Sequence, residues 1–310
     1  MSNFAVTSSP HLRDKATSQR IMQEVCLALA PAGIAGIILY GFNAALLIAI
    51  CVATCVLSEF IWQKATKQAV TISDWSAVVT GLLLAYNLPA TAPWWVAVIG
   101  SIIAIVLVKQ FFGGIGSNFM NPALTARAIL FISWSGIMGA YPKAQPMQFF
   151  ADAVTGATPL ATLNGGSIEG LKLMDLLLGN HGGVLGETCA IAIILGGVYL
   201  LIRSIADWRI PVSFIGTVFV CYLIKDGAEM ALYQLLAGGL LLGAFFMATD
   251  YATSPITRLG RVIFGVGCGL FLFLIRAFAN YPEGCSFAIL FMNVATPMIT
   301  RPQTVMGLVA

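Results

Sequence analysis

The chain has 310 residues, of which 59% are hydrophobic and only 9% are charged, and its formal net charge is +3 at pH 7. So few charged side chains cannot form the water-facing surface of a soluble protein of this length, which excludes an ordinary soluble domain. The chain must therefore use lipid as its solvent. Long apolar runs inside a bilayer satisfy their backbone polar groups as helices, so we expect an all-α integral membrane protein.

Apolar segments long enough to cross a bilayer recur along the whole sequence. A spanning helix needs about 20 mostly apolar residues, and on this criterion we predict ten transmembrane helices in a single polytopic domain over residues 1–310. The seventh segment is short, which leaves open whether it is tilted, broken or partly re-entrant. The ten segments are 22–40, 44–62, 75–90, 94–112, 122–139, 184–203, 211–225, 228–248, 260–278 and 285–300.

The distribution of Lys and Arg predicts the orientation of these segments. Cytoplasmic connections carry an excess of basic residues, and a cytoplasmic N-terminus leaves only Lys143, Lys172 and Lys225 on the opposite face. We therefore expect both termini in the cytoplasm. The longest connection, residues 140–183, then lies on the outer face, and a loop of that length is more often functional than filler.

A glycine-rich connection, Lys109–Ala123, joins the fourth and fifth segments on the cytoplasmic side. Its side-chain amides, Asn118 and Asn121, can pair with the edge of a planar heterocycle. The run is not a dinucleotide fingerprint, because no βαβ unit surrounds it. The alternative is a helix-capping turn with Asn121 as the cap and Pro122 in the first turn.

The outer connection contains Asp-Ala-Val-Thr-Gly-Ala-Thr at residues 152–158. A transferase that joins a bulky phosphate to one side-chain oxygen needs an acceptor with small neighbours, and Gly156 and Ala157 precede the hydroxyl of Thr158. The run resembles the flavinylation sequence Asp-x-x-(Ser/Thr)-Gly-Ala-Thr, in which the last Thr carries FMN through a phosphoester. Asp152 and Thr155 occupy its other fixed positions. The alternative is an ordinary turn, since Thr, Gly and Pro all favour turns.

These two stretches and two others resemble one family over nearly the whole chain. The matching residues are Phe112–Ala123, Asp152–Thr158, Gly186–Thr188 and Tyr281–Phe287, with the flavin and Asn-Pro-Ala motifs in the family's order and spacing. The chain resembles the D subunits of Rnf-type ferredoxin:NAD oxidoreductase complexes, a family similar to the B subunits of sodium-pumping NADH:quinone oxidoreductases. The resemblance implies a urea-transporter-like bundle of two pseudo-symmetric five-helix halves with opposite orientation.

The resemblance also implies two flavin cofactors. FMN is expected on Thr158 at the outer face, and a non-covalent riboflavin nearer the cytoplasmic side, where Asn118 and Asn121 match the family's positions. A hydrocarbon core about 30 Å thick is too wide for one small cofactor, so a relay needs sites at different depths. The expected function is electron transfer through a membrane flavoprotein, coupled in the complex to export of Na⁺ or H⁺.

The partners follow from the same resemblance. We expect the other members of an Rnf complex, especially the FMN-bearing G subunit and the membrane-embedded A and E subunits, a flavin transferase for maturation, and no nucleic acid. The expected location is the bacterial inner membrane, and the chain is expected to be inactive alone. The alternatives are a solute channel or secondary transporter of similar fold without redox activity, and a structural subunit that only anchors partners.

Charged residues inside the predicted spans are costly and tend to face protein or water. Arg276, late in the ninth segment, is a candidate contact of the flavin phosphate or the reduced flavin ring at the outer face. Arg127, in the fifth segment, is a candidate contact of the riboflavin; snorkelling or helix pairing is the alternative for both. Glu24, Glu59 and Glu187 lie near segment ends, where we expect exposure to the interface.

The seven cysteines indicate neither a disulfide framework nor a metal centre. Cys51 and Cys55 lie four residues apart in one apolar segment, but an iron–sulfur cluster takes four thiolates. We therefore predict no metal ligand in this chain and expect the iron–sulfur ligands of such a complex in partner subunits.

Overall fold

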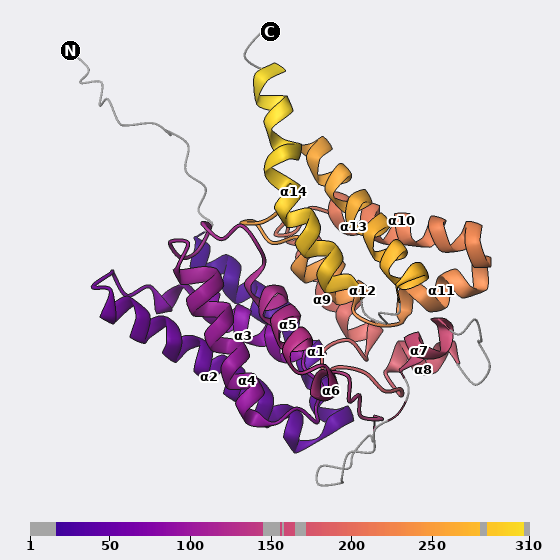
Figure 1. The fold of residues 1–310 in the computed structure, drawn as a ribbon, viewed down its shortest axis with the longest axis horizontal. Coiled ribbons are helices and arrows are strands. Elements are labelled where there is room, and N and C mark those ends of the chain that lie inside the picture. The colour runs from indigo at the N-terminus through magenta and orange to yellow at the C-terminus, as the bar shows by residue number, and fades with distance from the viewer. Residues whose placement is uncertain (1–16, 145–155, 157, 165–171, 280–283, 307–310) are drawn as a thin grey trace.

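The computed structural model describes residues 17–144, 156, 158–164, 172–279 and 284–306, with side chains up to residue 300. Within these residues the regular elements are helices, and no β-strand forms. Figure 1 shows the helices of the first half, α1–α6, gathered beside those of the second half, α9–α14. The described part of the chain is therefore all-helical, as predicted.

The first half contains two long helices followed by shorter ones. Thr17 caps the first helix by accepting a hydrogen bond from the backbone N–H of Arg20 at 3.3 Å, and Gly41, at φ +72°, permits the sharp reversal into the second. The helices are α1 Ser18–Tyr40, α2 Phe42–Ala65, η1 Ile72–Asp74, α3 Ser76–Tyr86, α4 Trp94–Ile102 with its π-helical continuation η2 Ile103–Gln110, α5 Pro122–Ser133 and α6 Ser135–Met138.

The second half begins with two short helices from the predicted outer connection. Its longer helices pack closely where small residues meet: a Cβ at Gly269 on α13 would lie 3.0 Å from the backbone oxygen of Phe214 on α10. The helices are α7 Pro159–Asn164, α8 Leu173–Leu178, α9 Ala190–Ile202, α10 Arg209–Asp226, α11 Ala228–Leu236, α12 Leu240–Leu242 with its π-helical continuation η3 Gly243–Met247, α13 Arg258–Phe278 and α14 Cys285–Met306.

The two halves share one main hydrophobic core, while α7, α8 and α11 form a second, smaller cluster. In Figure 1 the start of α1 and the end of α14 lie at one end of the bundle, and α7 and α8 lie at the opposite end. The molecule therefore has two distinct ends, which we call the α1 end and the α7 end.

The lengths of the helices test the predicted spans only in part. Each of the ten predicted segments contains a described helix, but three described helices, α1, α2 and α13, are individually long and apolar enough to cross a membrane. A fourth qualifies if α11 and α12–η3 count as one span. The apolar α3, α5 and α9 are shorter than a bilayer is thick. The count of ten, the pseudo-symmetry and the urea-transporter-like arrangement stay predictions.

The break in the second half occurs in a different segment from the one we singled out. The seventh segment forms α10, one continuous helix of 18 residues. The eighth segment is instead bent by 68° between α11 and α12. Gly238 explains the position of the bend, because it adopts φ +70°, a conformation that side-chain-bearing residues rarely take.

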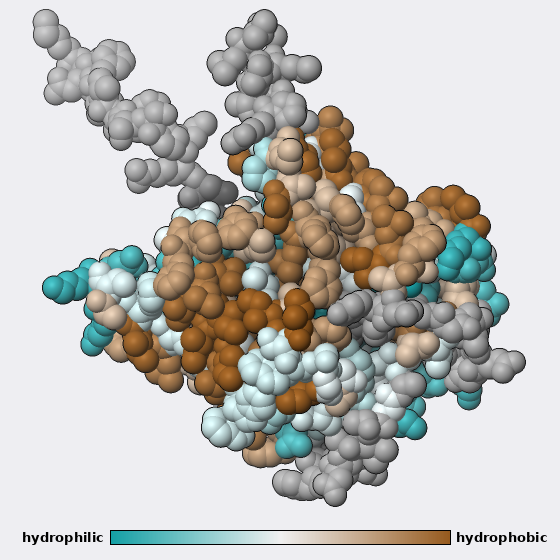
Figure 2. All heavy atoms as spheres, viewed as in Figure 1, coloured by the Kyte–Doolittle hydropathy of each residue, from teal (hydrophilic) through white to brown (hydrophobic). Residues whose placement is uncertain are grey.

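Large apolar side chains cover much of the outer surface of the helices. Examples are Ile61, Ile132 and Ile224, which are 63%, 70% and 80% exposed. Figure 2 shows apolar side chains over the visible faces of α4, α13 and α14, with hydrophilic groups toward the edges of the molecule. So much exposed apolar surface is typical of a protein that contacts lipid or membrane partners.

Candidate functional site

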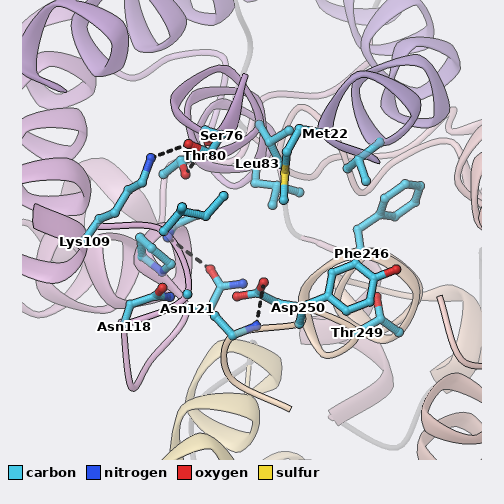
Figure 3. Close-up of a pocket in the computed structure, with 18 of the residues that line it drawn as sticks. Met22, Ser76, Thr80, Leu83, Lys109, Asn118, Asn121, Phe246, Thr249 and Asp250 are labelled. Atoms are coloured by element: carbon cyan, nitrogen blue, oxygen red, sulfur yellow. Dashed lines mark hydrogen bonds between the residues drawn. The ribbon is translucent and has the colours of Figure 1, made fainter. Parts of the chain in front are cut away.

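A cavity opens at the α1 end, between α1, α3, the η2–α5 connection and the turn after η3 (Figure 3). Its walls are mostly apolar and include Met22, Leu83 and Phe246. The space between the lining atoms, including the part open to the outside, is about 790 Å³. A mostly apolar cavity with a few convergent polar groups is the usual form of a small-molecule site.

Both asparagines of the glycine-rich connection line this cavity. Asn121 Oδ1 accepts hydrogen bonds from two backbone N–H groups in the first turn of α5, at 3.1 and 3.3 Å, and its Nδ2 donates to the Met247 carbonyl at 3.3 Å. The amide is thus a helix cap, as the structural alternative predicted. Asn118 donates to the Met120 carbonyl at 3.0 Å, and among the described residues none donates to its Oδ1. Asn118 is therefore the better placed of the two to bind a ligand.

A buried ion pair supports one wall of the cavity. Lys109 Nζ donates to both carboxylate oxygens of Glu59 at 2.9 Å and to Ser76 Oγ at 2.6 Å, and Gln110 Nε2 donates to Glu59 at 2.8 Å. Glu59 is 1% exposed and Lys109 3%. The expectation that Glu59 is exposed at the interface is therefore wrong. Burial is tolerated because a cation and amide donors satisfy the carboxylate.

Asp250 is an acidic lining residue that the sequence did not single out. It follows η3, and its carboxylate accepts hydrogen bonds from Ala252 N and Thr253 Oγ1, both at 3.4 Å. No cationic side chain in the described chain lies within ion-pair distance of it. Burial raises the pKa of the Asp250 carboxyl. Its position directly after an apolar span was the only signal that the sequence offered for it.

The described residues of the predicted flavin-attachment segment lie at the α7 end. Asp152, Thr155 and Ala157 lie outside the described residues, whereas Gly156 and Thr158 are described. The Gly156 N–H donates to the Tyr141 carbonyl at 3.0 Å. Thr158 Oγ1 accepts from the backbone N–H of Ala161 at 3.3 Å and so caps α7. The Thr158 side chain is thus held at the start of a helix.

Thr158 is only 7% exposed, although an acceptor for a bulky group needs access to its oxygen. The residues that follow explain the burial. Leu160 and Leu163 are 2% and 3% exposed, because α7 packs against α8 and α11 in the second hydrophobic cluster. The helix α7, which begins directly after Thr158, is thus docked on the bundle.

Three side chains converge on the break between α11 and α12. At Gly238 an added Cβ would collide with Leu160 and would lie 3.2 Å from Arg276 Nη2. At Gly239 an added Cβ would collide with Glu187 Oε1. Neither position can therefore hold a larger residue, because neighbouring side chains approach the backbone too closely. The two glycines bring Leu160, two residues after Thr158, next to a buried arginine and a buried carboxylate.

Arg276 stabilises the broken helix. Its Nη1 donates to the Gln234 carbonyl at 2.7 Å, and its Nη2 donates to the Ala237 carbonyl at 3.1 Å. These carbonyls lie at the end of α11, where a helix needs outside donors. A guanidinium also suits the negative end of the helix dipole. Arg276 thus pairs α13 with α11, which was the structural alternative, and its contact with a flavin stays a prediction.

Arg127 lies with Glu187 and Ser286 and is not among the residues that line the cavity with Asn118. Its Nη2 is 3.7 Å from Glu187 Oε1, and its Nη1 donates to Ser286 Oγ. Glu187 interacts electrostatically with both arginines and is 3% exposed. The expectation of an interfacial Glu187 is wrong, because two cations make burial of its charge tolerable.

The two places suit different chemical groups. The cavity offers an apolar slot with an amide edge, which fits a flat, largely neutral heterocycle. The α7 end holds the hydroxyl of Thr158 and the buried cation Arg276, which are the residue types that a covalently attached phosphate group requires. Among the described residues, no cluster of three or more His, Cys, Asp or Glu side chains is placed to hold a metal ion, and the seven cysteines are free thiols.

Together these features define a helical membrane protein with one candidate small-molecule site toward each end of the bundle. The sequence profile of the NQR2, RnfD, RnfE family matches residues 5–306. Because this match covers almost the entire chain, the protein belongs to that family.

Curated relatives align over nearly their full lengths. The D subunit of the Na⁺-translocating ferredoxin:NAD⁺ oxidoreductase complex of Acetobacterium woodii is 48% identical over 303 residues, covering 96% of this chain and 93% of the relative. The D subunit of the proton-translocating ferredoxin:NAD⁺ oxidoreductase complex of Clostridium ljungdahlii is 39% identical over 314 residues, covering 96% and 94%. The D subunit of an ion-translocating oxidoreductase complex of Escherichia coli is 33% identical over 343 residues, covering 97% of each chain.

Proposed function

We propose that this chain is the D subunit of an ion-translocating ferredoxin:NAD oxidoreductase complex of the Rnf type in the bacterial inner membrane. In it, electrons pass between FMN attached to Thr158 and a riboflavin held in the cavity at the α1 end. The observation that carries the proposal is the near-full-length match to the D subunits of such complexes, combined with the flavinylation sequence at residues 152–158.

The arrangement of the chain's own residues supports this relay. In the cavity, Asn118 would bind the polar edge of the riboflavin ring, Asn121 would keep the entrance of α5 in place, and the apolar walls would exclude water. At the α7 end, Thr158 would hold the FMN phosphate and Arg276 would provide positive charge nearby. When bound, the flavins supply the redox chemistry, and the protein supplies their spacing, shelter and electrostatics.

In this proposal the termini face the cytoplasm and Thr158 faces outward. In Figure 1, α7 and α8 lie opposite the start of α1 and the end of α14. This placement supports a topology in which Thr158 and the termini are on opposite sides of the membrane. The G, A and E subunits are the proposed partners, and a flavin transferase the maturation enzyme. The transported ion stays open between Na⁺ and H⁺, because one named relative is described as sodium-translocating and another as proton-translocating.

The covalent flavin provides the direct test. The chain is co-expressed with a flavin transferase, denatured, separated on a gel and examined for flavin fluorescence, with peptide mass analysis of the region around Thr158. We expect fluorescence in the parent and none in Thr158→Ala. Thr158→Ser, which keeps a hydroxyl, is the matched control for loss of the methyl group alone.

A dark parent band would refute the flavin relay, provided that the transferase modifies a second substrate in the same cells. The solute channel or transporter would then become the leading hypothesis. Fluorescence that survives in Thr158→Ala would place the attachment at another residue and would remove the role proposed for Thr158.

A further inference from the structure

Glu187 has a position that no flavin-binding motif assigns to it. Its Oε1 lies against Gly239, and the side chains of Leu160 and Arg276 lie against the adjacent Gly238. Leu160 is two residues from Thr158 in the chain. A group attached to Thr158 therefore lies no farther from Glu187 and Arg276 than a few residues of chain can span. The carboxylate and the guanidinium are therefore near neighbours of the proposed FMN.

The carboxylate of Glu187 differs from the other buried glutamate of this chain. Both oxygens of Glu59 are hydrogen-bonded, with Lys109 Nζ at 2.9 Å from each. Glu187 Oε1 has no hydrogen-bond donor among the described residues, and its ion-pair distance to Arg127 is 3.7 Å. A structural carboxylate is normally saturated by donors. Glu187 Oε1 is thus held by the electrostatic contact with Arg127 and not by saturated hydrogen bonds.

Burial makes the electrostatic field of Glu187 effective over a longer distance. Glu187 and Arg276 are each 3% exposed, so water and salt screen them little. A flavin that accepts one electron from a donor gains one negative charge unless a proton follows. A nearby carboxylate opposes this gain, and a nearby guanidinium favours it. The two residues therefore act on the same reduction in opposite directions.

We propose that Glu187 lowers the reduction potential of the flavin attached to Thr158 and that Arg276 raises it, so that this buried pair sets the potential of the outer site. The proposal rests on the proposed attachment of FMN to Thr158. A unit charge roughly 10 Å away at an effective dielectric constant of about 20 changes such an equilibrium on the order of tenfold. For one electron, a tenfold change corresponds to about 59 mV.

The test is a spectroelectrochemical titration of the detergent-solubilised, covalently flavinylated protein, with dithionite as the electron donor and redox dyes as mediators. The Thr158→Ala protein, titrated in parallel, identifies absorbance changes that do not come from the covalent flavin. In Glu187→Gln we expect the reduction potential of the covalent flavin to rise by about 59 mV, which corresponds to a tenfold change in the equilibrium. Glu187→Asp, which keeps the charge, is expected to stay near the parent value.

The matched control is Glu229→Gln. It makes the same chemical change at an exposed position in the first turn of α11, where solvent screens the charge. We expect no measurable shift there. Equal shifts in the two variants would show a general charge effect and would overturn the proposal.

An unchanged or lower potential in folded, flavinylated Glu187→Gln would also overturn it. If that variant does not fold, Arg276→Gln gives an independent test, because its potential is expected to fall; an unchanged or higher potential there would contradict the proposal. A parent protein without covalent flavin would instead refute the proposed function itself. Failure of the proposed function can therefore be distinguished from failure of the proposal on the reduction potential before any potential is measured.

Discussion

The cavity at the α1 end and the break at the α7 end illustrate two ways to build polar sites in a membrane protein. At the cavity, the buried charges of Glu59 and Lys109 neutralise each other within hydrogen-bond distance, and amides face the cavity. At the break, Glu187 and Arg276 lie against two adjacent glycines, one of which also meets Leu160 of α7, and among the described residues they form no direct hydrogen bond with each other. The first arrangement suits a neutral ring held by shape, and the second suits a charged group held covalently.

The largest expected effect comes from a substitution that disrupts only the first region, the cavity at the α1 end. Lys109→Met leaves Glu59 buried without its cation, which typically costs about 3–5 kcal/mol. We expect a large loss of thermal stability in detergent and loss of the non-covalent flavin. The double variant Lys109→Met with Glu59→Gln should recover most of the stability, since no charge is then left unpaired. A single variant as stable as the parent would show that the pair is not what supports this wall.

A glycine substitution addresses the second region. Gly238→Ala forces a side chain into φ +70° and against Leu160. We expect a cost of about 1–3 kcal/mol from backbone strain, plus the cost of the collision, and a lower yield of covalent flavin because the docking site of α7 is distorted. Gly227→Ala is the matched control, because Gly227 has φ +90° but nothing within 4 Å of an added Cβ. Thermal unfolding and in-gel fluorescence of both variants give the comparison. Equal effects would exclude a role for the Leu160 contact.

Binding of the non-covalent flavin sharpens the contrast further. Asn118→Leu removes the amide that faces the cavity, and we expect at least tenfold weaker retention of riboflavin, with the covalent flavin on Thr158 unchanged. Flavin released on denaturation and separated by chromatography measures both pools. Asn293→Leu is the control, because Asn293 is also buried, at 2% exposure, but does not line the cavity. Parallel loss of both flavins in Asn118→Leu would mean that the regions are not independent.

The smallest effect concerns Asn121, where the structure indicates a helix cap. Asn121→Ala should reduce stability by about 0.5–2 kcal/mol, the usual cost of losing an N-cap. Asn121→Asp keeps the cap oxygen and should retain much of that stability, although it gives up the bond to the Met247 carbonyl. Chemical unfolding in detergent measures both variants. A stable Asn121→Ala protein that has lost riboflavin would instead make Asn121 a direct ligand contact.

Sequence reasoning could single out candidate site residues, but it could not predict which individual charges are buried. Asn118, Asn121 and Thr158 could be singled out because short motifs with fixed spacing surround them. Glu59 and Glu187 could not be judged in the same way, because their burial depends on cations from distant helices. Lys109 is 50 positions from Glu59, and Arg127 is 60 positions from Glu187.

The position of the helix break shows the same limitation. Segment length drew attention to the seventh segment, yet α10 is continuous. The eighth segment bends at Gly238, where Leu160 approaches closely and Arg276 binds the freed carbonyls of α11. A glycine permits a bend, but only the surrounding side chains make it stable. Those side chains come from parts of the chain that lie far apart in sequence.

The sequence by itself determined the class of this protein: composition required lipid as the solvent, and apolar runs required helices. Local motifs singled out Thr158 and the asparagine pair as candidate site residues. These properties depend on residues that are neighbours along the chain. The tertiary structure alone decided which charges are buried and that Glu187 and Arg276 both reach the glycines at the break beside α7. Such properties depend on long-range packing, because a charge or an amide acquires its function from the groups that the fold brings within a few ångströms of it.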